Sequence, residues 1–469
     1  MDRVFVIGLD GGEPSLIFRM VEEGKLPVIA ELVDNGAYGK LRSTIPPITG
    51  PAWVSMMTGK NPGKHGIFHF VARDPKTYQR FLKTSKDIDS KVLWQLLSEN
   101  DKRVGIVNVP FTYPPQKVNG FLVSGLPAPG EWSDFTYPEQ LKHTLKKFDY
   151  KINTDVNTFY KKDAFVKNLH DVTHNHFRFI THALIRYNLD FFMYVFQGLD
   201  QIQHFFWGDS CVEEFYMEID KYIGVLKEKF DDATFVIVSD HGFGKQIGEF
   251  YIGNFLIRKG LLKLKKEKFN IFRKIGLTKD TVRKIISRSS ILQRTALNMP
   301  RPLKDKIPSK DINFKDIDWF NTQAYSCACG EVYINLKGRE RYGTVDERDY
   351  GCIIDYISDE IVSINKNFRT YKNSDIYSGK HASEGPDLIV NSEEAGYLES
   401  NFSSDGSLFG KGNKRGTHRF NGVVIISGDN IKSNKRINAS IYDITPTILD
   451  IFDMGIPKDC DGRSLLSVI

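Results

Sequence analysis

Three aspartates and two histidines stand at the ends of apolar runs whose composition predicts buried strands. Asp240 and His241 follow the run FVIVS, and Asp10 follows the run VFVIGL. Asp200 ends a third run, and His204 comes four residues later. Short apolar runs rich in β-branched residues are typical of buried parallel strands, and α/β sheets bind ligands at the carboxyl ends of such strands. The pattern predicts one cluster of carboxylates and imidazoles at an edge of a sheet, although Asp240 alone could also be a helix cap beside a surface histidine.

Carboxylate and imidazole ligands together favour zinc or manganese over magnesium or copper(I). Asp200 and His204 can face one ion if a helix starts at this point, because residues four apart share a helix face. Two divalent ions about 4 Å apart can hold a phosphoryl oxygen between them while one activates the nucleophile and the other the leaving group. Phosphoryl transfer is therefore the chemistry that such a cluster would support.

Thr49 is a candidate nucleophile on a turn stiffened by prolines. Pro46, Pro47 and Pro51 surround it, and they disfavour a helix until about Ala52. A hydroxyl just before a helix lies near free backbone N–H groups and the positive end of the helix dipole, which suits an alkoxide or a phosphate. The alternative is that Thr49 serves only as a helix N-cap.

Strands alternating with helices must position these residues. The runs Val104–Val109 and Phe191–Phe196 predict further strands, separated from the others by helical patterns. This alternation predicts an α/β fold with a doubly wound, mostly parallel sheet, helices on both faces and helical insertions. We expect residues 1–254 to form the first part of this core, with a helical insertion at about 137–187, and residues 311–469 to form the second part.

The composition excludes several classes of protein. With 469 residues, the chain can bury one large core with insertions, or two to three domains. Its 41% hydrophobic and 26% charged content excludes disorder. No apolar run approaches the ~20 residues of a spanning helix. The five cysteines are scattered, which favours reduced thiols. Because a strand pattern begins directly after Met1, we expect a cytoplasmic protein.

The segment 255–310 holds the whole basic excess of the chain. It contains 17 lysines and arginines against 3 aspartates and glutamates, whereas the remaining residues contain 47 against 55. Phe, Ile, Leu and Val recur among the positive charges at helical spacing, so we expect a basic helical cap. Such a cap could contact an anionic membrane surface or nucleic acid, or steer an anionic substrate. The alternative is a packed helical cap with a solvated, charged outer face.

Several motifs together resemble the alkaline phosphatase superfamily. Within it the chain is most similar to the type I phosphodiesterase/nucleotide pyrophosphatase branch, and to a group of predicted prokaryotic phosphohydrolase/phosphomutase proteins. The motifs keep the family's order over nearly the whole chain. They are GLDGG, TGPAWVSMMTGKNPGKHGIF, GLDQIQHFFW, SDHGFG, EVYINLKGRE, THRFNGV, DITPTILDIF and DGRSL.

The resemblance implies two divalent metal ions, zinc in the first place and manganese as the alternative. It also implies that Thr49 attacks phosphorus to form a phosphothreonine, which water then hydrolyses. The implied ligands are Asp10, Asp240 and His241 with Thr49 for one ion, and Asp200, His204 and His418 for the other.

One position departs from the family pattern. The nucleotide pyrophosphatase branch has an asparagine shortly after the HGI segment that contacts a non-bridging phosphate oxygen, and Phe70 occupies that position here. Without this donor, recognition of a diester through that phosphate oxygen is in doubt. His69 and Asn108 are the candidate replacements.

The sequence predicts a metal-dependent phosphohydrolase acting on a mono- or diester of a phosphorylated small molecule or a nucleotide-like compound. A phosphomutase that returns the phosphate to a sugar or glycerate phosphate is the first alternative. A non-catalytic basic docking protein on the same fold is the second. The sequence makes no prediction of the oligomeric state.

Overall fold

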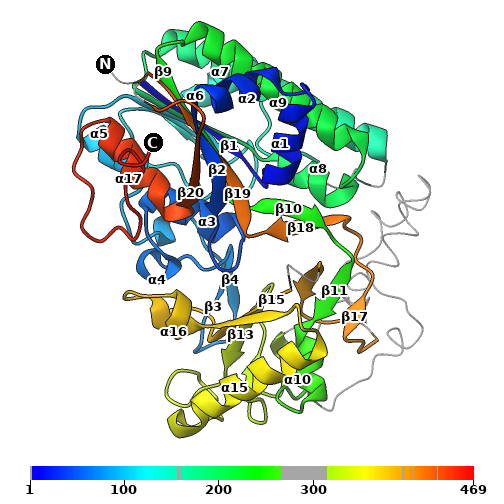
Figure 1. Ribbon diagram of the computed structural model, residues 1–469. Helices are drawn as coiled ribbons and strands as arrows, with labels where there is room; N and C mark the ends of the chain where they lie inside the picture. Colours follow the sequence, from blue (N-terminus) through cyan, green and yellow to red (C-terminus); the bar gives the residue numbers. More distant parts are fainter. Residues whose placement is uncertain are drawn as a thin grey trace.

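The protein is built around one nine-stranded sheet (Figure 1). The computed structural model describes residues 3–155, 159, 161–265, 314–392, 396–403, 405–429 and 431–469. In spatial order, the strands of the sheet are β20 (Lys435–Ser440), β2 (Gly36–Arg42), β19 (Asn421–Ser427), β9 (Ala233–Val238), β1 (Arg3–Leu9), β8 (Phe191–Phe196), β5 (Val104–Val109), β6 (Gly120–Ser124) and β7 (Thr136–Tyr137).

The middle of the sheet is parallel. β1 pairs in parallel with both β8 and β9, and β5 pairs in parallel with β8 and β6. β19 runs antiparallel between β9 and β2. β5 and β8 are buried along their whole length, as expected of parallel strands covered on both faces. The predicted mostly parallel α/β sheet is confirmed.

The sheet is doubly wound, with a hydrophobic core on each face. Along β1, Phe5, Ile7 and Leu9 belong to one core and Val4 and Val6 to the other, because successive side chains of a strand point to opposite faces. The first core lies under α1 (Pro14–Glu22), α2 (Pro27–Asp34), α6 (Leu141–Lys146), α7 (Lys162–Arg186), α8 (Gly198–Phe206) and α9 (Ser210–Lys229). The second lies under α3 (Thr49–Thr58), α5 (Leu93–Glu99) and α17 (Ile444–Ile451).

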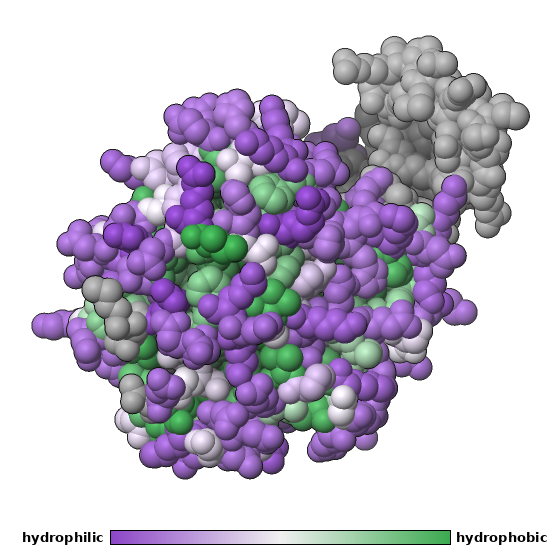
Figure 2. Space-filling view, turned by 90° about the horizontal axis from the view of Figure 1, so that it is seen from above, coloured by the Kyte–Doolittle hydropathy of each residue, from purple (hydrophilic) through white to green (hydrophobic). Residues whose placement is uncertain are grey.

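The predicted helical stretch 137–187 contains α6 and α7. Seen from above, the molecule presents a mainly hydrophilic face with apolar residues in small separate groups (Figure 2). Among the described residues, no helix is both long and apolar enough to cross a membrane.

A second, smaller unit, which we call the cap module, lies beside the central sheet (Figure 1). It has its own hydrophobic cluster, which includes Phe250, Tyr325 and Val390. Its main sheet is antiparallel and contains β12 (Ala324–Tyr325), β13 (Glu331–Ile334), β15 (Leu388–Asn391) and β14 (Arg369–Lys372), accompanied by α10 (Ile252–Arg258) and α15 (Glu347–Ile364). A three-stranded sheet adds β16 (Tyr397–Ser400), β11 (Gly248–Tyr251) and β17 (Phe409–Gly410).

The chain enters and leaves the cap module through a pair of antiparallel strands, β10 (Gly242–Lys245) and β18 (Gly416–Arg419). Of the stretch 311–469, which we expected to form the second part of the core, β19, β20 and α17 belong to the central sheet and its helices, whereas β12 to β15 form the separate cap sheet. The cap module is thus inserted between the end of β9 and the start of β19.

The predicted basic segment 255–310 lies only in part within the described residues. Phe255, Leu256 and Leu262 are buried in the cluster of the cap module. From residue 266 onward the segment lies outside the described residues, so the predicted cap and its contacts stay a prediction.

Candidate active site and metal centre

The first group of ligands lies where two neighbouring strands end. Asp10 directly follows β1, and Asp240 and His241 come after β9. The register of these parallel strands pairs Gly8 with Val238, so both strands end at the same level. His241 Nε2 lies 3.2 Å from Asp240 Oδ2 and 3.7 Å from Asp10 Oδ1. All three side chains are buried, and their ligand atoms lie close enough together to hold one metal ion.

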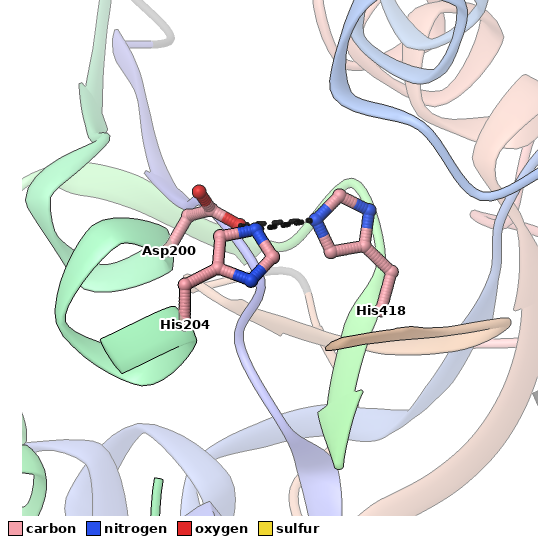
Figure 3. A group of neighbouring side chains, drawn as sticks. All are labelled: Asp200, His204 and His418. Carbon is pink, nitrogen blue, oxygen red and sulfur yellow. Dashed lines mark hydrogen bonds and ion pairs between the residues drawn. The ribbon is translucent and has the colours of Figure 1, made fainter. Parts of the chain in front are cut away.

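The second group comes from two separate places in the chain (Figure 3). Asp200 and His204 lie one turn apart on α8, which starts immediately after β8, and His418 reaches them from β18. His418 Nε2 lies 3.2 Å from both Asp200 Oδ1 and His204 Nε2. The helix that the sequence required at Asp200 is therefore present.

The two groups adjoin each other. The rings of His241 and His418 stack with their centroids 3.7 Å apart. The predicted cluster thus has two adjoining parts, each with three ligands.

All three imidazoles are oriented by hydrogen bonds to the backbone. A carbonyl oxygen can only accept, so each Nδ1 carries the proton and each Nε2 presents a lone pair. This arrangement is typical of metal-binding histidines. The acceptors are the carbonyls of Gly416 for His204, Gly242 for His241 and Pro47 for His418, at 2.9, 3.1 and 2.9 Å.

Several acceptor atoms of the site lack a donor. Asp10 Oδ1 and Asp240 Oδ2 are buried and have no hydrogen-bond partner in the part of the chain that the structure describes. The Nε2 atoms of His204 and His418, both with lone pairs, face each other at 3.2 Å. Buried acceptors without donors are costly, and a cation would satisfy all of them. The donor set therefore fits divalent metal ions, and its mixture of oxygen and nitrogen fits zinc or manganese.

Burial dominates the protonation of the site. Burial raises the pKa of Asp10, with the charges of Asp240 and Asp200 adding to the effect, and burial likewise raises the pKa of Asp240. Burial lowers the pKa of His204 to about 3 and that of His241 well below its ordinary value, so both imidazoles are neutral. Burial opposes ionisation of Asp200 as well. Even so, the electrostatic interaction with His204 and the contact with His418 hold the pKa of Asp200 below its ordinary range. Neutral imidazoles are the form that binds metal.

Thr49 lies beside both groups. Its hydroxyl Oγ1 is 3.3 Å from His241 Nε2, and its side chain lines a cavity that also reaches Asp10 and His418. Our expectation that the helix begins at about Ala52 is wrong, because α3 begins at Thr49 itself. Pro51 is accommodated in the first turn, where the backbone N–H has no partner within the helix.

The cavity, of about 340 Å³, lies between the central sheet and the cap module. The core contributes Asp10, Thr49, Asp200 and His204, together with Gln197 and Gln201, whereas Asp240 and His241 lie outside the cavity lining. The cap module and the loop that leads out of it contribute Cys329, Asn391, Tyr397, Glu399 and Lys414.

Residues 4–422 match the sequence model of the type I phosphodiesterase/nucleotide pyrophosphatase family. The chain belongs to this family. It is therefore a member of a family of phosphoester hydrolases, and the resemblance inferred from the motifs is confirmed.

Solved structures share the fold of this phosphodiesterase-family chain. Human ectonucleotide pyrophosphatase/phosphodiesterase 5 is 12% identical with a TM-score of 0.56, covering 100% of this chain and 99% of that one. An inactive murine form of it, in complex with AMP, is 12% identical with a TM-score of 0.54, covering 100% of both chains. Phosphonoacetate hydrolase from Sinorhizobium meliloti 1021, in complex with phosphonoformate, is 13% identical with a TM-score of 0.61, covering 95% of this chain and 94% of that one.

The three candidate substrate contacts have different surroundings in this family member. Phe70 lines the cavity and stacks on Phe111, with ring centroids 4.9 Å apart. His69 also lines the cavity, and burial lowers its pKa to about 4. Asn108 is not among the cavity residues; its amide donates to the carbonyl of Val195 at 3.0 Å. Asn108 therefore holds the ends of two neighbouring strands together.

A buried network that the sequence did not reveal holds the loop after β1. Gln203 Nε2 donates to Gly11 O at 2.8 Å, and Tyr216 donates to Gln203 at 3.1 Å. Gly11 N in turn donates to Asp240 Oδ1 at 3.1 Å. Gly11 has a φ of 72°, which favours glycine. Gln203 thus positions the loop that carries Asp10.

Proposed function

We propose that this member of the phosphodiesterase family is a metal-dependent hydrolase of phosphate mono- or diesters that uses Thr49 as its nucleophile. The observation that carries the proposal is the hydroxyl of Thr49, which lies 3.3 Å from His241 Nε2 beside two adjoining groups of metal-ligand candidates. A nucleophile at this place would face a phosphorus atom bound in the cavity.

The two ligand groups would each hold one divalent ion, zinc or manganese. Asp10, Asp240 and His241 would form one site with Thr49, and the second would use the group of Figure 3. When bound, the ions supply positive charge that stabilises the phosphoryl oxygens and favours deprotonation of a hydroxyl or a water.

The residues of the chain bind and orient the ester. The N–H groups of the first turn of α3 lie next to Thr49, where the helix dipole favours a negative charge. Thr49 Oγ1 would lose its proton and attack phosphorus, while the bond to the leaving alcohol breaks and that oxygen takes up a proton. Water would then cleave the phosphothreonine and release phosphate from a monoester, or a phosphate monoester from a diester. Nδ1 protons fixed on backbone carbonyls keep the three Nε2 atoms turned toward the site throughout.

The substrate class is a phosphorylated small molecule or a nucleotide-like ester. The murine relative in complex with AMP supports a nucleotide-like ligand. The phosphomutase alternative keeps the same first step but returns the phosphate to the substrate, so it predicts isomerisation without release of inorganic phosphate.

The direct test uses protein loaded with zinc, manganese or cobalt and chromogenic nitrophenyl mono- and diesters. We expect release of nitrophenol, and acid quenching followed by mass spectrometry should find a phosphorylated peptide that contains Thr49. A folded protein that hydrolyses no mono- or diester with any of the three metals would contradict the proposal. If the esters are hydrolysed but no phosphopeptide is found, even in rapid-quench samples, the phosphothreonine intermediate would be contradicted. The hydrolase activity itself would still hold.

A further inference from the structure

One cation of the catalytic cavity has no assigned role. Lys414 lies just before β18, on the return path from the cap module, and it lines the cavity together with Asp200 and His204. Its side chain is half-buried.

The ammonium group of Lys414 is not engaged by the part of the chain that the structure describes. Among the described residues, no ion pair and no hydrogen bond involves its side chain. A half-buried cation that lines a cavity without a partner is available to an anion of the ligand.

Glu399 is the acidic residue on the same wall, and it is occupied elsewhere. Its Oε1 accepts hydrogen bonds from Ser392 Oγ at 2.6 Å and from Ser392 N at 2.5 Å. Burial raises the pKa of Glu399, which favours its neutral form. Glu399 therefore does not cancel the charge of Lys414.

The cavity is larger than the reacting group requires. A phosphoryl group has five heavy atoms, which fill less than about half of the 340 Å³ at the ~30 Å³ that one water occupies. Asp10, Asp200, His204 and Thr49 line the core side. The remaining space extends toward Tyr397, Glu399 and Lys414 of the other wall.

We propose that Lys414 binds a second anionic group of the substrate. Resting on the proposed function, this defines the preferred substrates as phosphate esters whose alcohol part carries a carboxylate or a further phosphate. The reacting phosphoryl group is bound at the metal side, and Lys414 selects the remote end of the same molecule.

Binding of non-hydrolysable phosphonates tests the proposal without relying on turnover. The ligands are propylphosphonate, 3-phosphonopropionate and propane-1,3-diphosphonate, which share a chain length and differ in the charge of the tail. Titration calorimetry of the zinc-loaded protein should show that both anionic tails bind about tenfold or more tightly than the neutral one. Comparison of the two anionic tails identifies whether a carboxylate or a phosphate is preferred.

Lys414→Met should abolish this preference, and Lys414→Arg should retain most of it. Lys411→Met is the matched control, because Lys411 is exposed on the same loop and does not line the cavity. Melting curves establish that the variants fold.

Equal binding of charged and neutral tails by the wild type, or a preference that survives Lys414→Met, would overturn the assignment. The nitrophenyl ester assay is independent of it. If no ester is hydrolysed but the protein still prefers anionic tails through Lys414, the proposed hydrolase activity would be rejected. The anion subsite would still be supported.

Discussion

Two threonines of the same helix differ in what surrounds their hydroxyl groups. Thr58 Oγ1 donates to Val54 O at 2.8 Å, a bond within α3, and its side chain is buried. Thr49 Oγ1 instead points to His241 Nε2 at 3.3 Å and lines the cavity. One helix thus carries one hydroxyl that is bonded within the helix and one that faces the cavity.

The first prediction follows from this difference. Thr49→Ala should lower kcat by ~10³-fold or more, because the attacking atom is lost. Thr49→Ser should retain part of the turnover. Steady-state kinetics with nitrophenyl esters measure both, and Thr58→Ala is the control that keeps activity. Wild-type turnover by Thr49→Ala would mean that water attacks directly.

The second prediction concerns the apolar wall beside the nucleophile. Phe70 stacks on Phe111 and offers no hydrogen-bond donor to a phosphate oxygen. Phe70→Asn should raise the ratio of diester to monoester turnover by up to about tenfold, since one donor to a charged oxygen contributes about that much. Phe70→Leu, which keeps the wall apolar, should leave the ratio unchanged. An unchanged or lower ratio for Phe70→Asn would show that the position plays another role.

At the scale of elements, the sequence predicted what repeats along the chain. The strand patterns that end in Asp10 and Asp240 were enough to predict the first ligand group, because the carboxyl ends of adjacent parallel strands lie at the same edge of a sheet. Periodicity could not place Gln203, Glu399 or Lys414. Their positions depend on how α8 and the cap module pack against the sheet, which no local pattern encodes. The start of α3 was also missed, because a proline in a first turn resembles one before a helix.

A buried ion pair links the core to the cap module. The hairpin of β3 (Val71–Arg73) and β4 (Arg80–Leu82) inserts Arg73, which pairs with Glu340 at 2.9 Å and lies 4.0 Å from the ring centre of Tyr333. The side chains are only 5% and 0% exposed. The same hairpin carries Tyr78, which stacks on Trp319 of the module at 3.7 Å. These contacts fix one wall of the cavity relative to the other.

The third prediction tests this link. Arg73→Met should lower the free energy of unfolding by about 1–3 kcal/mol, because the buried Glu340 carboxylate would lose one of its two cations and keep only Arg339, 3.1 Å away. Lys91→Met, which breaks the exposed pair with Glu99, should cost less than about 1 kcal/mol. Urea denaturation measures both. Equal effects of the two variants would show that the buried pair does not hold the units together.

At the scale of the whole molecule, the candidate metal centre joins the ends of the chain. Asp10 belongs to the first strand of the central sheet, whereas His418 lies on the strand that returns from the cap module. Each ion would cross-link segments more than two hundred residues apart in the sequence, Asp10 with His241 in one group and Asp200 with His418 in the other. Metal binding should therefore stabilise the fold as well as support turnover.

The fourth prediction is a metal content of about two zinc or manganese ions per chain after dialysis. Chelation should lower the melting temperature, and free zinc at a hundred times its Kd should restore ~2.7 kcal/mol. Metal affinity should rise with pH, because burial raises the pKa of Asp10 and Asp240 and protons compete with the metal. Asp240→Asn should lose one ion. A folded, inactive protein that takes up no zinc, manganese or cobalt would contradict the prediction.

The last prediction concerns the basic excess of residues 255–310, against a net negative remainder of the chain. If this charge steers an anionic substrate, kcat/KM should fall as salt rises while kcat barely changes, because the Debye length is only ~8 Å near physiological ionic strength. If it docks on a membrane, the protein should sediment with vesicles of anionic lipid and not with neutral ones. Replacing Lys263, Lys265, Lys266 and Lys268 with glutamine tests both, and the last two lie outside the described residues. If the glutamine variant keeps the salt dependence and the vesicle binding of the wild type, the positive charge neither steers a substrate nor docks on a membrane. The segment would then be a packed cap whose charged side chains are only solvated.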